Sequence, residues 1–170
     1  GQAGDDEIDS GAGDDTFVWD GDGSGIDEFI SATGFNRVDV RGDDSDNTFT
    51  VSQSDEKLQV TEGSSTITLD EVITEVEINL GDGRDNVIVR SVDEVIPMVV
   101  IINGQNGRDT IDASRADLGR VLLVINGGGG NDMLIGSRSN DIIDGGNGND
   151  TILAGSGDDK LNGADGDDII

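Results

Sequence analysis

A nine-residue unit repeats without interruption from Gly127 to the end of the sequence. The five successive copies read GGGGNDMLI, GSRSNDIID, GGNGNDTIL, AGSGDDKLN and GADGDDII, the last one residue short. Each copy has a small residue at its fourth position, Asp at its sixth and an aliphatic residue at its eighth. A short fixed period of this kind constrains the fold more than any local propensity does, because it sets the whole architecture.

The composition limits the chemistry that this chain can perform. Its 170 residues include 37 acidic and 10 basic side chains, for a formal charge of −27, and contain neither Cys nor His. Disulfides, zinc sites built on Cys or His, and His-based acid–base catalysis are therefore excluded. The negative charge repels nucleic acid and anionic membranes, so we expect neither as a partner. The longest apolar run, residues 95–102, is too short to span a membrane.

Further copies of the motif occur outside the C-terminal run. GQAGDDEID begins at Gly1 and SGAGDDTFV at Ser10, and isolated copies begin at Leu80 (LGDGRDNVI) and Gly104 (GQNGRDTID). Together these motifs resemble the RTX, or haemolysin-type, calcium-binding nonapeptide family, whose signature is G-G-x-G-x-D-x-U-x. The resemblance implies an all-β fold, a right-handed parallel β-roll or β-solenoid. Two nonapeptides form one coil of such a roll, and the eighth position points inward.

We predict one continuous solenoid over residues 1–170, with about eight coils and calcium bound in the turns. Clear repeats cover residues 1–18, 80–88, 104–112 and 127–170, and degenerate longer coils cover 19–79, 89–103 and 113–126. Acidic chains poor in aromatic residues are often disordered. Here the apolar residues keep a constant offset from the turn residues, which favours order. The linker ASRADLGR from Ala113 is compatible with one helical turn that bulges from the roll.

Apolar residues spaced nine to twelve positions apart mark the inward side of successive strands. Alternate strands of such a roll lie on opposite faces, so alternate turns lie on opposite edges. The predicted inward residues are Ile8, Phe17, Phe29, Val38, Phe49, Leu58, Ile67, Val76, Val87, Val99, Ile111, Leu122, Leu134, Ile143, Ile152, Leu161 and Ile170.

The residue two positions before each inward residue describes the chemistry of each edge. The first edge carries Asp6, Asp27, Asn47, Ser65, Asp85, Asp109, Asp132, Asp150 and Asp168. The second edge carries Asp15, Asn36, Glu56, Thr74, Pro97, Arg120, Asp141 and Asp159. We therefore predict one long ladder of metal sites on the first edge, weakest near Asn47 and Ser65. On the second edge we predict sites only near the two ends of the sequence.

Stacked turns place the aspartates of neighbouring coils about 4.8 Å apart. Two carboxylates at that distance repel by about 3 kcal/mol at an effective dielectric of 20, unless a cation lies between the coils. Calcium suits this arrangement, because it takes 6–8 oxygen ligands in irregular geometry, whereas magnesium demands a strict octahedron and transition metals prefer His or Cys. The resemblance implies that aspartates at the sixth position and glycine carbonyls of the turns are the ligands of several Ca²⁺ ions. The predicted ligands are Asp6, Asp15, Asp27, Asp85, Asp109, Asp132, Asp141, Asp150, Asp159, Asp168, Gly128, Gly130, Gly146, Gly148 and Gly166.

The fifth-position side chains Asn131, Asn149, Asp158 and Asp167 are expected to face solvent or to cap the turns. We predict no enzyme activity, catalytic residue or organic cofactor, because the carboxylates recur at every turn instead of forming one distinct pair.

The resemblance implies a secreted bacterial protein that crosses the membrane unfolded and folds outside, where calcium is plentiful. The first hypothesis is a calcium-binding extracellular structural module, a segment of a large adhesin, matrix fibre or surface protein. The alternative is the C-terminal secretion and folding domain of a type I-secreted toxin or hydrolase whose catalytic domain is not in this chain. The expected partners are calcium and copies of the chain, or further repeats, joined end to end.

Overall fold

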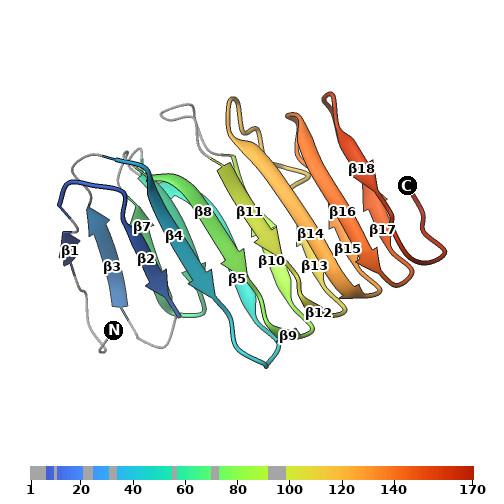
Figure 1. The fold of residues 1–170 in the computed structure, drawn as a ribbon, viewed down its shortest axis with the longest axis horizontal. Helices are drawn as coiled ribbons and strands as arrows, with labels where there is room; N and C mark the ends of the chain where they lie inside the picture. Colours follow the sequence, from blue (N-terminus) through green and yellow to red (C-terminus); the bar gives the residue numbers. More distant parts are fainter. Residues whose placement is uncertain are drawn as a thin grey trace.

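The protein is an elongated body built from β-strands (Figure 1). The structure, a computed structural model, describes residues 7–9, 11–20, 25–30, 34–54, 57–69, 73–91 and 99–170. Within these residues all regular secondary structure is β-strand, and no helix has the length and apolarity that crossing a bilayer requires. The strands lie side by side along the long axis, from β1 and β2 at one end to β17 and β18 at the other.

Two facing sheets share the strands. In spatial order, the first sheet contains β1 (Glu7–Asp9), β3 (Gly25–Ile30), β7 (Ser65–Leu69), β6 (Lys57–Glu62), β5 (Thr48–Ser54), β10 (Asn86–Val89), β13 (Thr110–Asp112), β15 (Met133–Ile135) and β17 (Thr151–Leu153). The second sheet contains β2 (Thr16–Trp19), β4 (Asn36–Arg41), β8 (Ile73–Asn79), β11 (Val99–Asn103), β14 (Leu122–Gly130), β16 (Asp141–Asn147) and β18 (Lys160–Asn162). Two short strands, β9 (Asp82–Gly83) and β12 (Asn106–Gly107), pair within the turns.

The core lies between the sheets and consists of stacked rows of aliphatic residues. Side chains alternate along a strand, so every second residue points inward. Along the first sheet, the paired and buried residues are Phe49, Val87, Ile111, Leu134 and Ile152. Along the second sheet, Ile78, Ile102, Ile125 and Ile143 form an equivalent row. The predicted all-β parallel solenoid is confirmed, and so are the inward positions Val38 and Val76, which are paired and fully buried.

One part of the solenoid departs from the predicted winding. Leu58 was expected on the second sheet, but it lies in β6, which runs antiparallel between β5 and β7 in the first sheet. The cause is the length of the connections. Glu62 pairs with Ser65, so two residues reverse the chain there, and Gly63 takes the positive φ of +56° that such a tight turn favours. A two-residue turn forms a hairpin, whereas the longer glycine-rich turns carry the chain across to the other sheet.

The predicted inward positions Val99 and Leu122 are also wrong, each by one residue. Val76 pairs with Val100, which pairs with Leu123, and both of these partners are buried. Val99 and Leu122 therefore point to the outer face of the second sheet. Both strands are apolar on their two faces (VVII and LLVI), so hydrophobicity does not identify the inward residue.

The linker from Ala113 to Arg120 forms turns without a helix. Instead of bulging away from the body, it inserts Ala116 and Leu118, which are 0% and 1% exposed, into the end of the core. The Ser91 hydroxyl bridges this linker by donating to the Arg115 carbonyl at 3.2 Å and accepting from the Asp117 N–H at 3.0 Å. The linker is thus fixed by both burial and hydrogen bonding.

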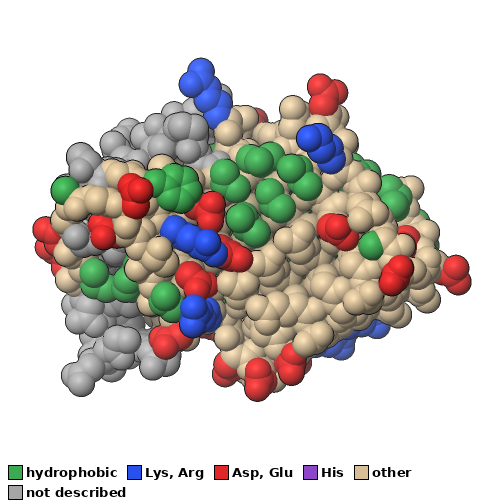
Figure 2. All heavy atoms as spheres, in the orientation of Figure 1, with side chains coloured by type: hydrophobic (Ala, Val, Ile, Leu, Met, Phe, Trp, Pro, Cys, Tyr) green, Lys and Arg blue, Asp and Glu red, His purple; other side chains and the backbone are tan. Residues whose placement is uncertain are grey.

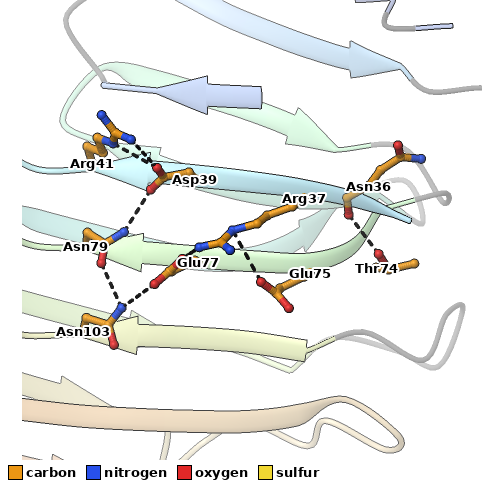
Figure 3. Close-up of polar contacts among 9 residues, drawn as sticks. All are labelled: Asn36, Arg37, Asp39, Arg41, Thr74, Glu75, Glu77, Asn79 and Asn103. Atoms are coloured by element: carbon orange, nitrogen blue, oxygen red, sulfur yellow. Dashed lines mark hydrogen bonds and ion pairs between the residues drawn. The ribbon is translucent and has the colours of Figure 1, made fainter. Parts of the chain in front are cut away.

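The outer face of the second sheet carries a polar network on β4, β8 and β11 (Figure 3). Arg37 pairs with both Glu75 and Glu77 on the adjacent strand. Asn79 donates to Asp39 at 2.9 Å and accepts from Asn103 at 2.8 Å. Figure 2 shows a group of hydrophobic side chains gathered on the face of the molecule that it views. Side-chain hydrogen bonds therefore hold neighbouring coils in register from the outside, as the core does from within.

Candidate metal centre

The first edge is the side of the solenoid where the chain passes from the second sheet into the first. Five of its turns cover residues 80–85, 104–109, 127–132, 145–150 and 163–168, and each ends on an aspartate. We call Asp85, Asp109, Asp132, Asp150 and Asp168 the aspartate ladder. Asp85 and Asp109 occur in adjacent turns of this one edge, as the predicted register requires. If these two turns lay on opposite edges, the predicted register would be wrong.

Each member of the ladder is tied to the next through one carboxylate oxygen. The N–H of Asp85 donates to Oδ1 of Asp109 at 2.9 Å, and the N–H of Asp109 donates to Oδ1 of Asp132 at 2.8 Å. The same bond joins Asp132 to Asp150 and Asp150 to Asp168. At the other end, the Asn47 N–H donates to Oδ1 of Asp85 at 2.7 Å. These bonds fix the orientation of each carboxylate.

The second carboxylate oxygen of the ladder is buried and has no hydrogen-bond partner. This holds for Oδ2 of Asp85, Asp109, Asp132 and Asp150. These four side chains are only 1–3% exposed. A buried charged oxygen without a partner costs far more free energy than one exposed to water. Four such oxygens in successive turns, each held by the same bond on its other side, indicate a repeated requirement for a cation.

Glycine at the first position of four of the five turns allows the free oxygen to approach a carbonyl of the next coil, and the fifth turn begins with Leu80. A Cβ atom on Gly127 would lie 2.6 Å from Oδ2 of Asp132 and 2.4 Å from the Gly145 carbonyl oxygen. A Cβ on Gly104 would meet Oδ2 of Asp109 at 2.6 Å and the Gly127 carbonyl oxygen at 2.3 Å. The carboxylate of one coil and the carbonyl of the next therefore converge on the same space, which any side chain would fill.

The donor set of these turns fits calcium. Among the described residues, no group of three or more Asp or Glu side chains is gathered to hold a metal by carboxylates alone. The remaining oxygen donors at the ladder are backbone carbonyls, and the carbonyls of Gly128, Gly130 and Gly148 face the glycine at the same position of the next coil. Calcium accepts mixed carboxylate and carbonyl sets at 2.3–2.6 Å. The residues present therefore fit the ion that the sequence predicts.

The glycines of one turn provide a matched test of this packing. Gly130 has a φ of +140°, and a Cβ there would lie 1.4 Å from the Gly107 carbonyl oxygen. At Gly129 the nearest atom to a Cβ would be Oδ1 of Asn106, at 3.4 Å. We expect Gly130→Ala to lower the free energy of unfolding in calcium by about 3 kcal/mol or more. We expect Gly129→Ala to change it by less than about 0.5 kcal/mol. Urea unfolding of both variants measures the difference, and equal losses would show that the turns are not packed as described.

Burial and neighbouring charge raise the pKa of three ladder carboxylates, those of Asp85, Asp109 and Asp132. Burial is the largest cause and raises the pKa of Asp109 to about 6, with further contributions from Asp132 and Asp85. Burial likewise raises the pKa of Asp85 and of Asp132. At the end of β6, burial raises the pKa of Glu62 to about 7, and the charges of Asp43 and Asp85 add to the shift.

These shifts predict opposite pH effects on the calcium-free fold and on calcium binding. Because the folded pKa of Asp109 is about 6 and its unfolded value near 4, the calcium-free fold loses stability as pH rises through this window. Calcium must displace the retained proton, so the midpoint of a calcium titration should increase several-fold between pH 7.5 and pH 5. Titrations followed by circular dichroism at both pH values measure it. A midpoint independent of pH would contradict the role of these carboxylates.

The second edge, where the chain returns to the second sheet, repeats the arrangement only in part. The Asp141 N–H donates to Oδ1 of Asp159 at 2.9 Å, so these two residues stack as predicted. The N–H of Ser137 donates to Oδ2 of Asp141 at 2.6 Å, and its hydroxyl lies 2.8 Å from Oδ1. Asp141 therefore has partners on both oxygens. Sequence reasoning missed the role of Ser137. The signal was present, because this copy has Ser at its second position, where the three copies around it have Gly128, Gly146 and Gly155.

Near the start of the chain, the Asp15 N–H donates to Oδ1 of Asn36 at 3.1 Å, and Oδ2 of Asp15 is buried without a partner. Asp6 lies outside the described residues, and only the backbone of Asp27 is described, paired with Ile67 inside β3. Ser65 was placed in the first-edge series, but it begins the strand after the hairpin and is not in the ladder. The ladder instead joins Asn47 directly to Asp85.

Two of the fifth-position side chains that were expected to cap the turns, Asn131 and Asn149, connect neighbouring turns. Oδ1 of Asn131 accepts the Asn149 N–H at 2.9 Å, and Oδ1 of Asn149 accepts the Asp167 N–H at 2.9 Å. Both asparagines are exposed. They therefore stabilise the stack of turns from the solvent side, opposite to the buried aspartates.

Comparison with known proteins agrees with this geometry. The family model of the RTX calcium-binding nonapeptide repeat matches residues 1–18, 124–152 and 144–170, with 4 copies. No curated protein and no solved structure matches the chain. The matched residues include the two repeats that open the sequence and the turns ending on Asp132, Asp141, Asp150, Asp159 and Asp168. This chain therefore carries calcium-binding nonapeptide repeats of the RTX family over residues 1–18 and 124–170.

Proposed function

We propose that this chain is an extracellular structural module whose solenoid folds when the aspartate ladder binds calcium. The observation that supports this most strongly is the row of four buried, unpartnered carboxylate oxygens on Asp85, Asp109, Asp132 and Asp150. A cation supplies the positive charge that these oxygens otherwise lack. Because a preformed site does not exist in the unfolded chain, the free energy of binding becomes free energy of folding.

The proposed ligands on the first edge are the aspartate ladder, with turn carbonyls such as those of Gly128, Gly130, Gly146, Gly148 and Gly166. The chain's own residues contribute orientation: each ladder N–H fixes Oδ1 of the next aspartate and leaves Oδ2 free for the ion. On the second edge we propose Asp15, and Asp141 with Asp159. We expect weaker binding at Asp141, because the ion must replace its bonds to Ser137.

The energetics of the ladder support an extracellular setting. Extracellular calcium modules function with dissociation constants of about 10⁻⁴–10⁻³ M. A chain with a formal charge of −27 and this ladder is expected to stay unfolded where calcium is scarce and to fold where it is millimolar. We propose that the folded chain is a segment of a larger secreted adhesin, matrix fibre or surface protein, with a structural and not a catalytic role.

Limited proteolysis tests this proposal under matched ionic conditions. We expect rapid digestion at about 0.1 µM calcium and resistance at about 1 mM calcium, within the affinity range of extracellular modules. Replacing calcium by 1 mM magnesium provides the control, because the irregular mixed donor set does not offer magnesium its octahedron. Equal resistance in all three conditions would exclude a calcium-dependent fold.

A further inference from the structure

The basic residues of this acidic chain are unevenly distributed. Only 10 of its 170 residues are Lys or Arg. Four of these ten belong to the second-edge turns and linker that follow β10, β13 and β15, namely Arg90, Arg115, Arg120 and Arg138. Figure 2 shows basic side chains on the upper rim of the molecule beside an acidic one, and mainly acidic side chains along the lower rim, where Figure 1 places β9 and β12, with basic ones at its right. We call these four residues the arginine cluster.

Like charges are brought together in this cluster with partial compensation: hydrogen bonds from Ser114 lower the pKa of Asp112 most, and the charge of Arg115 lowers it further. Arg115 and Arg138 lie in second-edge segments of neighbouring coils, which follow the paired strands β13 and β15, and the Arg138 N–H donates to the Ala116 carbonyl next to Arg115. All four arginines are exposed, and none forms an ion pair with a carboxylate among the described residues. The arginine on the outer face of β4 behaves differently, since Arg37 pairs with two glutamates. Four exposed arginines on one edge of a chain this acidic indicate a use for the positive charge.

Two pockets lie beside the cluster, one on each side of the linker that carries Ala116 and Leu118. The first, of about 410 Å³, is lined by Arg90 and Arg115 together with Ser91 and Asp112. The second, of about 460 Å³, is lined by Arg120 and Arg138 together with Asp117, Ser139 and Asn140. Each pocket therefore combines two guanidinium groups with one carboxylate and with hydroxyl or amide groups.

The linker that separates the pockets is held in place before any ligand binds. Its Ala116 carbonyl accepts the Arg138 N–H at 3.1 Å, and the Leu118 N–H donates to the Ser139 hydroxyl at 3.3 Å. Ala116 and Leu118 are buried, and Ser91 bonds to the linker from the neighbouring coil. A preorganised surface loses less conformational entropy when it binds a ligand.

We propose that the arginine cluster is a binding site for an acidic polysaccharide, a sugar chain bearing carboxylate groups. Guanidinium groups recognise carboxylates through paired hydrogen bonds. Asp112 and Asp117 accept hydrogen bonds and so suit sugar hydroxyls, while two adjacent pockets suit a polymer with spaced charges. A nucleic acid fits less well, because neither pocket is lined by an aromatic side chain for base stacking among the described residues.

Arg138 lies in the turn that ends on Asp141, a proposed calcium ligand, so the test uses the folded chain in millimolar calcium. The probe is an octasaccharide of alternating glucuronate and N-acetylglucosamine, and binding is measured by titration calorimetry at low ionic strength. The wild type should bind, and the double variant Arg115→Gln/Arg138→Gln should lose at least tenfold in affinity. The matched control is Arg84→Gln/Arg108→Gln, which removes the same charge from exposed first-edge positions and should bind as the wild type does.

Three further measurements make the outcome decisive. The same octasaccharide with its carboxylates reduced to alcohols should not bind, and single-stranded DNA of equal charge should bind more weakly than the acidic sugar. Circular dichroism should show that both double variants fold in calcium as the wild type does. The proposal is overturned if the wild type does not bind, if both double variants lose affinity equally, or if the uncharged sugar or the DNA binds as well as the acidic one.

Discussion

In chelator the chain should lose most of its β-structure, and adding millimolar calcium should restore it cooperatively. Without the ion, the ladder places carboxylates about 4.8 Å apart, where each neighbouring pair repels by about 3 kcal/mol at an effective dielectric of 20. With the ion present at 100 times its dissociation constant, each site adds about 2.7 kcal/mol of stability. Four buried sites together exceed the net stability of many domains of this size.

The expected size of this effect is a difference of tens of degrees in melting temperature. Each kcal/mol shifts the midpoint by about 2–4 °C for a chain of this length. Thermal melts followed by circular dichroism, in chelator and in 5 mM calcium, measure the shift, with sodium chloride of equal ionic strength as the control for simple screening. Superimposable melts in chelator and calcium would show that the ladder does not determine folding.

Replacing two ladder carboxylates by amides should have opposite effects in the two conditions. Asn keeps an Oδ1 that accepts the N–H of the preceding turn, but it removes the charge. Asn47, at the head of the ladder, shows that an asparagine fits the turn. In chelator, we expect Asp109→Asn/Asp132→Asn to be more stable than the wild type by about 2 kcal/mol or more, because buried repulsion is relieved. In calcium, we expect it to be less stable by about 5 kcal/mol, because two ligands are lost.

A charge-matched control separates this effect from net charge. Asp158 and Asp167 are exposed fifth-position carboxylates, so Asp158→Asn/Asp167→Asn removes the same formal charge from the surface. Urea unfolding in calcium compares the stabilities of the wild type and both double variants, and circular dichroism in chelator compares the β-structure that each retains without the ion. The control should change little in either condition. If the ladder variant is destabilised in both conditions, the carboxylates have a packing role and the reversal predicted here is wrong.

The register of the ladder could be predicted from the sequence because its motif is unambiguous. The glycine-rich turns ending on Asp85 and Asp109 specify which residue faces inward, and the structure places both turns on one edge. The segment containing Phe49, Leu58 and Ile67 could not be predicted in the same way. Its nine-residue spacing equals that of the repeats, but its connections are too short to cross between sheets, so it folds as an antiparallel meander.

Other features depend on three-dimensional context that a periodic pattern does not contain. Val99 and Val100 are equally apolar, and only the pairing with Val76 identifies Val100 as the inward residue. The bonds from Ser137 to Asp141 distinguish the second edge from the first, although both edges carry a sixth-position aspartate. The unpartnered Oδ2 oxygens are likewise visible only in the structure. They are the observation that locates the proposed ions.

Anomalous diffraction from crystals grown in calcium tests the central claim most directly. We predict anomalous peaks at about 2.3–2.6 Å from Oδ2 of Asp85, Asp109, Asp132 and Asp150, each also near a carbonyl of an adjacent turn. Peaks confined to surface carboxylates, or a first edge without anomalous density at millimolar calcium, would contradict it.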